Sequence, residues 1–417
     1  MTERHPLAFA QFRRFLIART ATTIAQNALA VVIGWQVYDI ARQTMSPKEA
    51  ALQLGLIGIA QFLPLMLLTL VVGWTADRVD RRWIARAAIS LDMFCAALLA
   101  YLTWSGNVSL PALFSVAVLL GVARAFAMPA MQALAPKLVP PEILPRAIAM
   151  NSIGWQLGAI IGPALGGYLY AAHHVLPYGV ATVLFGLSLA GLLLIAPVPI
   201  TALVGSTNPW RQMVEGLAYV RRNRLVLGAI SLDLFAVLLG GATAMLPIFA
   251  RDILAVGPEG LGHLRAAPAA GAAITALWLS FRPLRHNVGP KMLLAVIVFG
   301  AATIVFGLSR SMPLSLGSLF LLGVADMISV FVRQSLVQIY TPDEMRGRVG
   351  AVSTLFISGS NELGEAESGM LAALVGPVAA VVAGGVGAII VTVLWSRWFP
   401  ELRRALTFEP PKSHQSQ

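Results

Sequence analysis

The chain has 417 residues, of which 57% are hydrophobic and only 12% charged, with a formal net charge of +11. A soluble core of this size cannot hide that much apolar surface, so the composition excludes an ordinary soluble protein and predicts a polytopic membrane protein. The basic residues lie in short segments between apolar runs, without interleaved aromatics, which argues against nucleic-acid binding. The single cysteine, Cys95, excludes an intrachain disulfide framework.

Twelve apolar runs are long enough to cross a bilayer. Residues 1–14 lack the cleavage pattern of a signal peptide, so the first run is expected to remain as a spanning helix. The runs lie near residues 15–40, 52–76, 83–104, 110–136, 146–170, 177–196, 225–250, 260–282, 289–309, 313–340, 347–372 and 376–397.

Basic residues are distributed unequally between the two sides of this topology. With both ends in the cytoplasm, the inward segments carry 21 lysines and arginines, and the outward segments carry four, namely Arg42, Lys48, Arg251 and Arg310. Cytoplasmic loops of membrane proteins are enriched in positive charge. We therefore expect both termini in the cytoplasm, in an inner (plasma) membrane of the bacterial type.

The longest break between runs divides the chain into two sets of six spans. We predict an N-terminal six-helix bundle over 1–196, a cytoplasmic linker with an amphipathic helix over 197–224, a C-terminal six-helix bundle over 225–400 and a cytoplasmic tail over 401–417. A shift of 202 residues aligns the two halves, because it places Gly121 on Gly323 and the polar residues Pro140, Glu142 and Arg146 on Pro342, Glu344 and Arg348. This agreement indicates a parallel repeat, as in transporters with a central cavity.

Charged residues inside the predicted spans are the main functional evidence, because each costs roughly 2.5 to 3.5 kcal/mol at a helix centre. Proton coupling needs a carboxylate whose ionised form is disfavoured by burial. Asp233 and Glu362 fit this role best, with Asp326 and Glu365 next, and a static ion pair with an arginine is the alternative. The charges within spans are Arg19, Asp39, Asp92, Arg124, Asp233, Arg265, Asp326, Arg333, Glu362, Glu365 and Glu367.

The arginines among these residues are candidates for the substrate cavity. Arg124 lies midway along the fourth span, and the repeat aligns it with Asp326 in the tenth, which suggests opposite charges across a cavity. Arg19 and Arg265 are further candidates. Arg333 is expected to extend to the inner membrane face instead.

The segment between the second and third spans, Gly73 to Arg82, has the sequence GWTADRVDRR. It is predicted to be a tight cytoplasmic loop, in which Gly73 permits close packing and Asp77 can accept hydrogen bonds from free backbone donors at a helix start. Its arginines, Arg78, Arg81 and Arg82, are attracted to the anionic inner leaflet. A basic stop after a membrane helix is the alternative.

This pattern, G-x-x-x-D-R-x-D-R-R, resembles motif A of the major facilitator superfamily. It departs at Thr75 and Asp80, where leucine and glycine are usual, and the second change recurs among drug and siderophore exporters. The resemblance implies that Asp77 bonds the start of the eleventh helix, near Gly347, while the cytoplasmic side is closed.

The fifth span places small residues every four positions along one face, which permits close helix packing. Packing alone is one interpretation. The run also resembles motif C, which marks antiporters and exporters of this superfamily. Its residues are Gly154, Gly158, Gly162, Pro163, Gly166 and Gly167.

Two pairs, Glu142 with Arg146 and Glu344 with Arg348, stand four residues apart before the fifth and eleventh spans. This spacing pairs side chains on one helical face. Solvated ion pairs are the plain interpretation, whereas the resemblance implies a cytoplasmic charge network that includes motif A.

The resemblance covers nearly the whole chain, and the stretches Gly34–Asp39 and Gly58–Pro64 are most similar to the drug:proton antiporter branch that includes the enterobactin exporter and macrolide efflux proteins. It implies an all-α membrane protein of the major facilitator fold, with twelve helices in two pseudo-symmetric bundles. It also implies a secondary transporter that exports amphipathic, drug-like small molecules by proton antiport and alternating access.

A siderophore exporter is the close alternative, and an importer of a small anionic solute through Arg124 and Arg265 is a more distant one. An enzyme has little support, because no metal-ligand cluster, P-loop or nucleophile elbow occurs in the sequence. The expected partners are a small-molecule substrate, protons and the lipid bilayer. We expect a monomer without cofactor, metal or nucleic acid.

Overall fold

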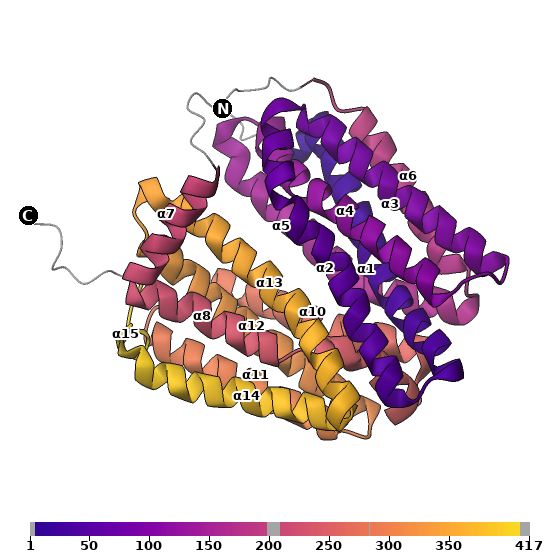
Figure 1. Cartoon of the computed structure of the whole chain (residues 1–417). Coiled ribbons are helices and arrows are strands. Elements are labelled where there is room, and N and C mark those ends of the chain that lie inside the picture. The colour runs from indigo at the N-terminus through magenta and orange to yellow at the C-terminus, as the bar shows by residue number, and fades with distance from the viewer. Residues whose placement is uncertain (1–4, 198–208, 283, 409–417) are drawn as a thin grey trace, which may run out of the picture. The chain divides into compact units, whose positions relative to one another are not determined.

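The computed structural model describes residues 5–197, 209–282 and 284–408 (Figure 1). All regular secondary structure in these ranges is helical, which confirms the predicted all-α class. The twelve long helices that correspond to the predicted spans are α1 (Ala10–Thr44), α2 (Pro47–Arg78), α3 (Arg81–Trp104), α4 (Leu110–Leu134), α5 (Leu144–Ala172), α6 (Leu176–Leu193), α8 (Arg224–Leu239), α10 (Gly257–Phe281), α11 (Val288–Leu308), α12 (Met312–Ile339), α13 (Asp343–Val375) and α14 (Pro377–Trp398).

Shorter elements connect these helices. The predicted amphipathic helix of the linker is α7 (Pro209–Arg222). Residues 198–208 of the predicted linker and residues 409–417 of the predicted tail lie outside the described residues. The remaining elements are η1 (Pro6–Ala8), η2 (Ala135–Leu138), η3 (Pro141–Ile143), η4 (Ala242–Met245), α9 (Leu246–Ile248), the π-helix η5 (Phe249–Ile253) and α15 (Pro400–Arg404).

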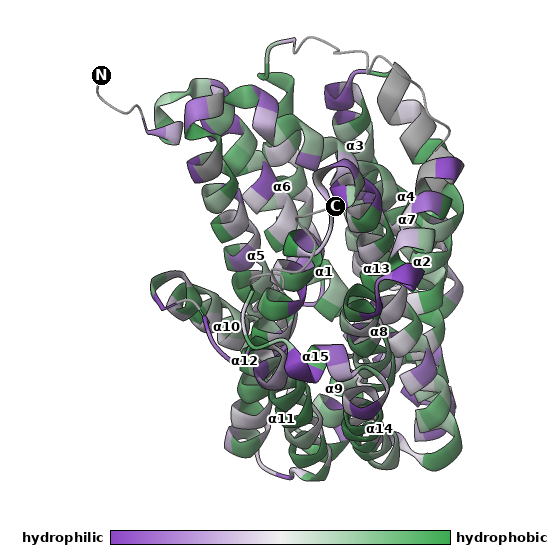
Figure 2. Ribbon diagram, turned by 90° about the vertical axis from the view of Figure 1, so that its left-hand side faces the viewer, coloured by the Kyte–Doolittle hydropathy of each residue, from purple (hydrophilic) through white to green (hydrophobic). Residues whose placement is uncertain are grey.

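Ten helices in the described part of the chain are long and apolar enough to cross a membrane. Figure 2 shows apolar residues along the long helices. Helix α13, with 33 residues, is not among these ten. Its length still exceeds the roughly 20 residues that a spanning helix needs.

Local signals set several helix ends. Helix α2 begins with a capping box, in which Ser46 N donates to Glu49 Oε2 at 2.8 Å and Glu49 N donates to Ser46 Oγ at 3.3 Å. Asn223 caps α8 by accepting a hydrogen bond from Val226 N at 3.2 Å. Between α13 and α14 the chain turns at Gly376, whose φ of 94° favours glycine.

The chain forms two compact units. Unit 1 comprises Met1–Ser206 and Leu246–Ala266, and unit 2 comprises Thr207–Met245 and Ala267–Gln417. The division predicted from the sequence places Leu246–Ala266 with the C-terminal spans, whereas by its contacts this segment packs within unit 1. The reason is a set of polar contacts with α1 and α5, described below.

Within unit 1, α1 packs on α5 and α6, α3 packs on α4 and α6, and α2 packs on α4. Within unit 2, α11 packs on α12 and α14, and α8 packs on α13 and α14. A core cluster of unit 2 contains Leu232, Val332 and Trp395 from three of these helices.

The repeat seen in the sequence recurs in the packing of each unit. A Cβ placed on Gly121 of α4 would collide with the carbonyl oxygen of Gln61 on α2. A Cβ placed on Gly323 of α12 would collide with the carbonyl oxygen of Pro268 on α10. Two glycines that the 202-residue shift aligns therefore permit equivalent close helix contacts.

Candidate functional site

The motif A segment is more helical than the sequence indicated. Helix α2 continues through Arg78 and α3 begins at Arg81, so the predicted ten-residue loop is wrong and only Val79 and Asp80 separate the two helices. Helix α2 extends because no proline stands between its apolar part and Arg78. The side chains of Asp77 and Arg78, and the surroundings of Gly73, lie outside the described residues, and so does the predicted bond of Asp77 to the start of the eleventh helix.

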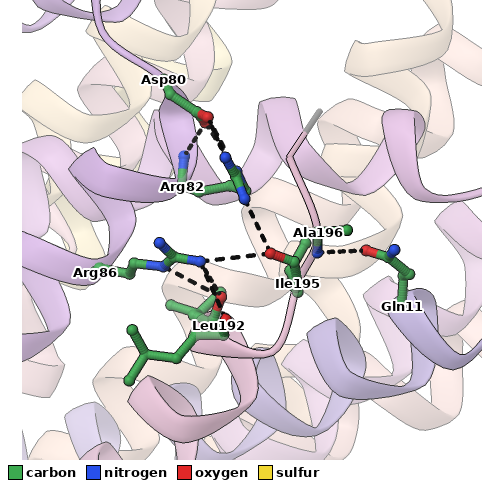
Figure 3. Close-up of polar contacts among 8 residues, drawn as sticks. Gln11, Asp80, Arg82, Arg86, Leu192, Ile195 and Ala196 are labelled. Carbon is green, nitrogen blue, oxygen red and sulfur yellow. Dashed lines mark hydrogen bonds and ion pairs between the residues drawn. The ribbon is translucent and has the colours of Figure 1, made fainter. Parts of the chain in front are cut away.

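Asp80 has a structural role at the start of α3. Its Oδ1 accepts a hydrogen bond from Arg82 N at 2.9 Å, which caps the helix, and its Oδ2 lies 2.6 Å from Arg82 Nη2 (Figure 3). These side-chain hydrogen bonds from Arg82 lower the pKa of Asp80. The aspartate that replaces the usual glycine therefore caps the start of α3 and also binds the guanidinium of Arg82. The neighbouring Arg81 is half-buried.

Arginines also satisfy the free carbonyl groups at the C-terminal end of α6. Arg82 Nη1 donates to Ile195 O at 3.0 Å, and Arg86 Nη2 donates to Leu192 O at 2.9 Å (Figure 3). Arg14 of α1 donates to a third carbonyl oxygen of this turn at 2.8 Å. Positive charge at a helix C-terminus is favourable. Arg14, Arg82 and Arg86 thus hold α1, α3 and α6 together inside unit 1. Only Arg82 belongs to motif A, and sequence reasoning missed this role for it.

The two predicted glutamate–arginine pairs differ in the structure. Glu142 belongs to the 3₁₀ turn η3 and Arg146 to α5, so the two do not share one α-helix as their spacing predicted. The 3₁₀ turn over residues 141–143 ends where α5 begins, so it separates Glu142 from the α-helix that carries Arg146. Glu344 and Arg348 do share α13, but Arg348 Nη1 lies 2.7 Å from Glu215 Oε2 on the linker helix α7. Any network at this end of unit 2 therefore includes the linker.

The small residues of motif C pack against α1. Their spacing predicted a close helix contact but did not identify the partner helix. At each of the three central glycines of this face, an added Cβ would approach α1 closely, in two cases within 2.7 Å of its backbone. This stripe therefore brings the two backbones together. The glycines and the α1 residues they meet are Gly158 with Thr23, Gly162 with Asn27 and Gly166 with Ala28.

The last part of α5 contacts the beginning of α10, which belongs to unit 1. A Cβ on Gly167 would collide with the carbonyl oxygen of Pro258, and a Cβ on Gly262 would lie 2.7 Å from the carbonyl oxygen of Pro163. Tyr168 Oη and His263 Nε2 are 2.7 Å apart, and their rings pack edge to face. The end of motif C therefore forms a second, partly polar helix contact.

A cluster of charges joins α1 to η5 at the end of unit 1 that is predicted to face outward. Tyr38 Oη donates to Asp252 Oδ2 at 2.6 Å, and Arg42 Nε donates to the same oxygen at 3.2 Å. Asp39 lies 3.0 Å from Arg251 Nη2. These contacts, together with the Tyr168–His263 pair, account for the packing of Leu246–Ala266 in unit 1.

Among the predicted coupling carboxylates, Asp233 of α8 forms a buried ion pair with Arg333 of α12. This is the alternative that the sequence left open at Asp233. The expectation that Arg333 reaches the inner membrane face is wrong, because its side chain is 4% exposed and turned toward Asp233. Asp326 is half-buried and interacts electrostatically with both groups. The structure therefore brings three span charges of unit 2 together.

The other two carboxylates lie on α13. The side chain of Glu362 lies outside the described residues, whereas Glu365 is half-buried and takes part in an interaction within the structure.

The three candidate cavity arginines all belong to unit 1. Arg124 is exposed on α4, and Arg265 is half-buried on α10. Arg19 of α1 is half-buried, with Nη1 3.9 Å from Met131 Sδ. Arg124 interacts electrostatically with Asp92 of α3, also in unit 1.

Asp92 makes a buried polar contact. The sequence analysis named it as a charge within a span but gave it no role. It is 1% exposed at the middle of α3, and Gln26 Nε2 of α1 donates to its Oδ2 at 3.0 Å. The signal in the sequence was an uncompensated charge at a helix centre. Its partner could not be read from the sequence, since the two residues are 66 positions apart.

Comparison with known proteins gives one consistent family. The model of the transmembrane secretion effector family (MFS_3) matches residues 1–408. Enterobactin exporter EntS of Escherichia coli O1:K1 / APEC and that of Shigella boydii serotype 18 are each 29% identical over 399 residues, which cover 94% of this chain and 92% of the relative.

Solved structures agree at the level of the fold. A peptide transporter POT matches with a TM-score of 0.74 at 12% identity, over 97% of this chain and 100% of the other. A bacterial homolog of the human lysosomal transporter Spinster matches with a TM-score of 0.72 at 14% identity, over 99% and 100%. The chain is thus an integral inner-membrane efflux transporter for a small molecule, and it belongs to the transmembrane secretion effector family of the major facilitator superfamily.

Proposed function

We propose that this transporter exports amphipathic, drug-like small molecules in exchange for protons, by alternating access. The observation that carries the proposal is the burial of carboxylates at the centres of spanning helices, with Asp92 1% and Asp233 6% exposed. Buried carboxylates at such depth are costly and usually functional. A proton-driven carrier needs groups of this kind, because it must bind and release protons within the membrane.

The export direction is supported by the resemblance of α5 to motif C and by relatives that are exporters. In alternating access, the contacts of Leu246–Ala266 with α1 and α5 would open and close in each cycle. They consist largely of partly exposed polar pairs, such as Arg42 with Asp252. Such pairs exchange for water at a cost of about 1 kcal/mol or less, which suits a gate.

A siderophore is the second candidate substrate. It is favoured by the match to enterobactin exporters over 94% of the chain. Three span arginines, Arg19, Arg124 and Arg265, lie in unit 1, and siderophores commonly carry acidic iron-binding groups that arginines can bind.

Transport in reconstituted vesicles tests both candidates. Full-length protein is placed in vesicles with an imposed pH gradient, and the movement of ethidium, an amphipathic cation, is compared with that of enterobactin. We expect the gradient to drive one of them against its concentration, and a protonophore to stop it. Movement that ignores both the gradient and the protonophore would contradict proton antiport.

Variants then locate the coupling. Asp233→Asn, Glu362→Gln, Asp326→Asn and Glu365→Gln remove titration while keeping shape, and at least one should abolish gradient-driven transport yet leave exchange measurable. Glu401→Gln is the matched control, since Glu401 pairs with Arg224 in a partly exposed position on α15. If all four variants pump as the control does, none of these residues couples transport to protons.

A further inference from the structure

A second buried carboxylate, in unit 1, has a partner of a different chemical kind from that of Asp233. Asp92 of α3 accepts a hydrogen bond from Gln26 Nε2 of α1 at 3.0 Å. Asp233 of α8 accepts one from the guanidinium of Arg333. One carboxylate is therefore bonded to a neutral amide and the other to a permanent cation.

These two partners respond differently to a proton. A guanidinium can only donate, so it satisfies an ionised carboxylate and has no acceptor for the hydrogen of a carboxylic acid. A primary amide donates through nitrogen and accepts through oxygen. Gln26 Nε2 can donate to ionised Asp92, and after rotation of the amide Gln26 Oε1 can accept the O–H of protonated Asp92. Both protonation states of Asp92 are thus hydrogen-bonded, as buried polar groups require.

The other groups around Asp92 are few. Arg124, on the adjacent helix α4, attracts the carboxylate. Cys95, one turn further along α3, is a buried free thiol close enough to interact with it. Helix α6 also packs on α3, and its residues Leu176–Leu193 include no charged side chain; the titratable Tyr178 near its start is fully buried.

The hydrogen-bond partner offers the proton a route to Asp92. The carboxylate is 1% exposed, whereas Gln26 is half-buried, so the partner amide is nearer to the surface of unit 1 than the carboxylate itself. The nearest charged residue to Gln26 along α1 is Arg19, two turns earlier, whose Nη1 lies 3.9 Å from Met131 Sδ.

We propose that Asp92, with Gln26 as a rotating hydrogen-bond partner, is a proton-binding site of unit 1. One proton adds to the carboxylate as the amide rotates, and it leaves as the amide rotates back. The role of this site in transport rests on the proposed function. A cationic cargo attracted to ionised Asp92 would compete with the proton, and mutually exclusive binding is what exchange requires.

Infrared difference spectroscopy tests the site without any cargo. The full chain is reconstituted in vesicles of phosphatidylethanolamine and phosphatidylglycerol, and spectra are recorded in acidic and alkaline buffer. The carbonyl stretch of a protonated carboxyl group disappears when that group ionises. We expect Asp92→Asn to remove one such titrating band, and Gln26→Arg to remove the same band because a guanidinium would keep Asp92 ionised. Glu401→Gln should retain it.

Identical titrating bands in wild type and in folded Asp92→Asn would overturn the proposal. If Asp92→Asn does not fold, Gln26→Arg decides, because it keeps the carboxylate, and an unchanged band would then refute the site. Vesicle transport separates this result from the proposed function. Wild-type transport that ignores the pH gradient, with the Asp92 band present, would defeat proton antiport and leave the site standing. Gradient-driven transport in a protein that lacks the Asp92 band would support proton antiport and refute Asp92 as the proton-binding site.

Discussion

Arg348 of α13 is bound by Glu215 of the linker helix α7, with 2.7 Å between Nη1 and Oε2. The linker helix is further fixed to unit 2 by Tyr219 Oη, which donates to Tyr340 O at 2.6 Å, and by Val220, which is 1% exposed. Because α13 follows α12 directly, α7 is attached at the junction of two spanning helices. A linker that is docked in this way moves with unit 2.

This docking leads to a first prediction. Glu215→Gln removes the ion pair with Arg348, worth up to about 1 kcal/mol at a partly exposed site. In a Cys95→Ser, Val220→Cys background, maleimide labelling at position 220 should then rise, by up to about fivefold for 1 kcal/mol. Arg211→Gln is the control, because it removes only the exposed pair between Arg211 and Glu215. Equal labelling in the two variants would mean that the Arg348 pair does not hold α7.

A second prediction concerns the charge cluster at the predicted outer end of unit 1. Tyr38→Phe removes the hydroxyl that donates to Asp252, a hydrogen bond to a charged group worth about 1.5 to 3 kcal/mol. The contact between α1 and η5 should open more often, so a cysteine at the fully buried position Ala41 should react faster from outside. Tyr101→Phe, on an exposed ring of α3, should not change the labelling. No difference between these variants would mean that the Tyr38 hydroxyl does not hold α1 to η5.

The third prediction is a pH dependence. Hydrogen bonds from Arg82 lower the pKa of Asp80 in the folded protein. This contribution is therefore present above the unfolded pKa, about 3.9 for an aspartate, and is lost as the pH falls through the lower folded value. Asp80→Asn keeps an N-cap but loses the charge, and it should destabilise the protein by about 1 kcal/mol near neutral pH after allowance for solvent screening.

Thermal unfolding in detergent at several pH values measures this effect. The melting temperatures of wild type and Asp80→Asn should differ at neutral pH and converge in acid. A difference that stays constant across this range would show that the charge of Asp80 does not contribute.

A fourth prediction concerns the stripe of small residues on α5. Gly158→Val would place side-chain atoms against Thr23 and the backbone of α1, and overpacking of this kind costs about 1 to 3 kcal/mol. We expect a lower melting temperature and slower transport. Gly179→Ala is the control on α6, since nothing lies within 4 Å of its added Cβ and alanine favours helix. If both substitutions are tolerated equally, the α1–α5 contact is not close-packed in the membrane.

Much of the fold follows from local properties of the sequence. Spanning helices are visible because about 20 apolar residues are needed to cross a bilayer, whatever they pack against. The linker helix α7 was predicted from its amphipathic pattern, and the close-packing face of α5 from the spacing of Gly158 and Gly162, because both depend on helical periodicity within one segment.

Other features depend on which helices become neighbours. Arg82 bonds a carbonyl oxygen 113 residues away, Asp233 pairs with an arginine 100 residues away, and Asp92 finds its amide on α1. The sequence named all three as charges or motif residues, but a charge in a span has many candidate partners. Which partner it meets is set by helix packing, since these hydrogen bonds act only over about 3 Å.

The sequence by itself thus determined that the chain consists of long apolar helices, because hydrophobicity acts on each segment alone. Only the tertiary structure decided that Leu246–Ala266 packs in unit 1 and that Asp92 has a neutral partner while Asp233 has a cationic one. The physical reason is that a buried charge must be satisfied by whichever groups the packed helices bring within hydrogen-bonding distance.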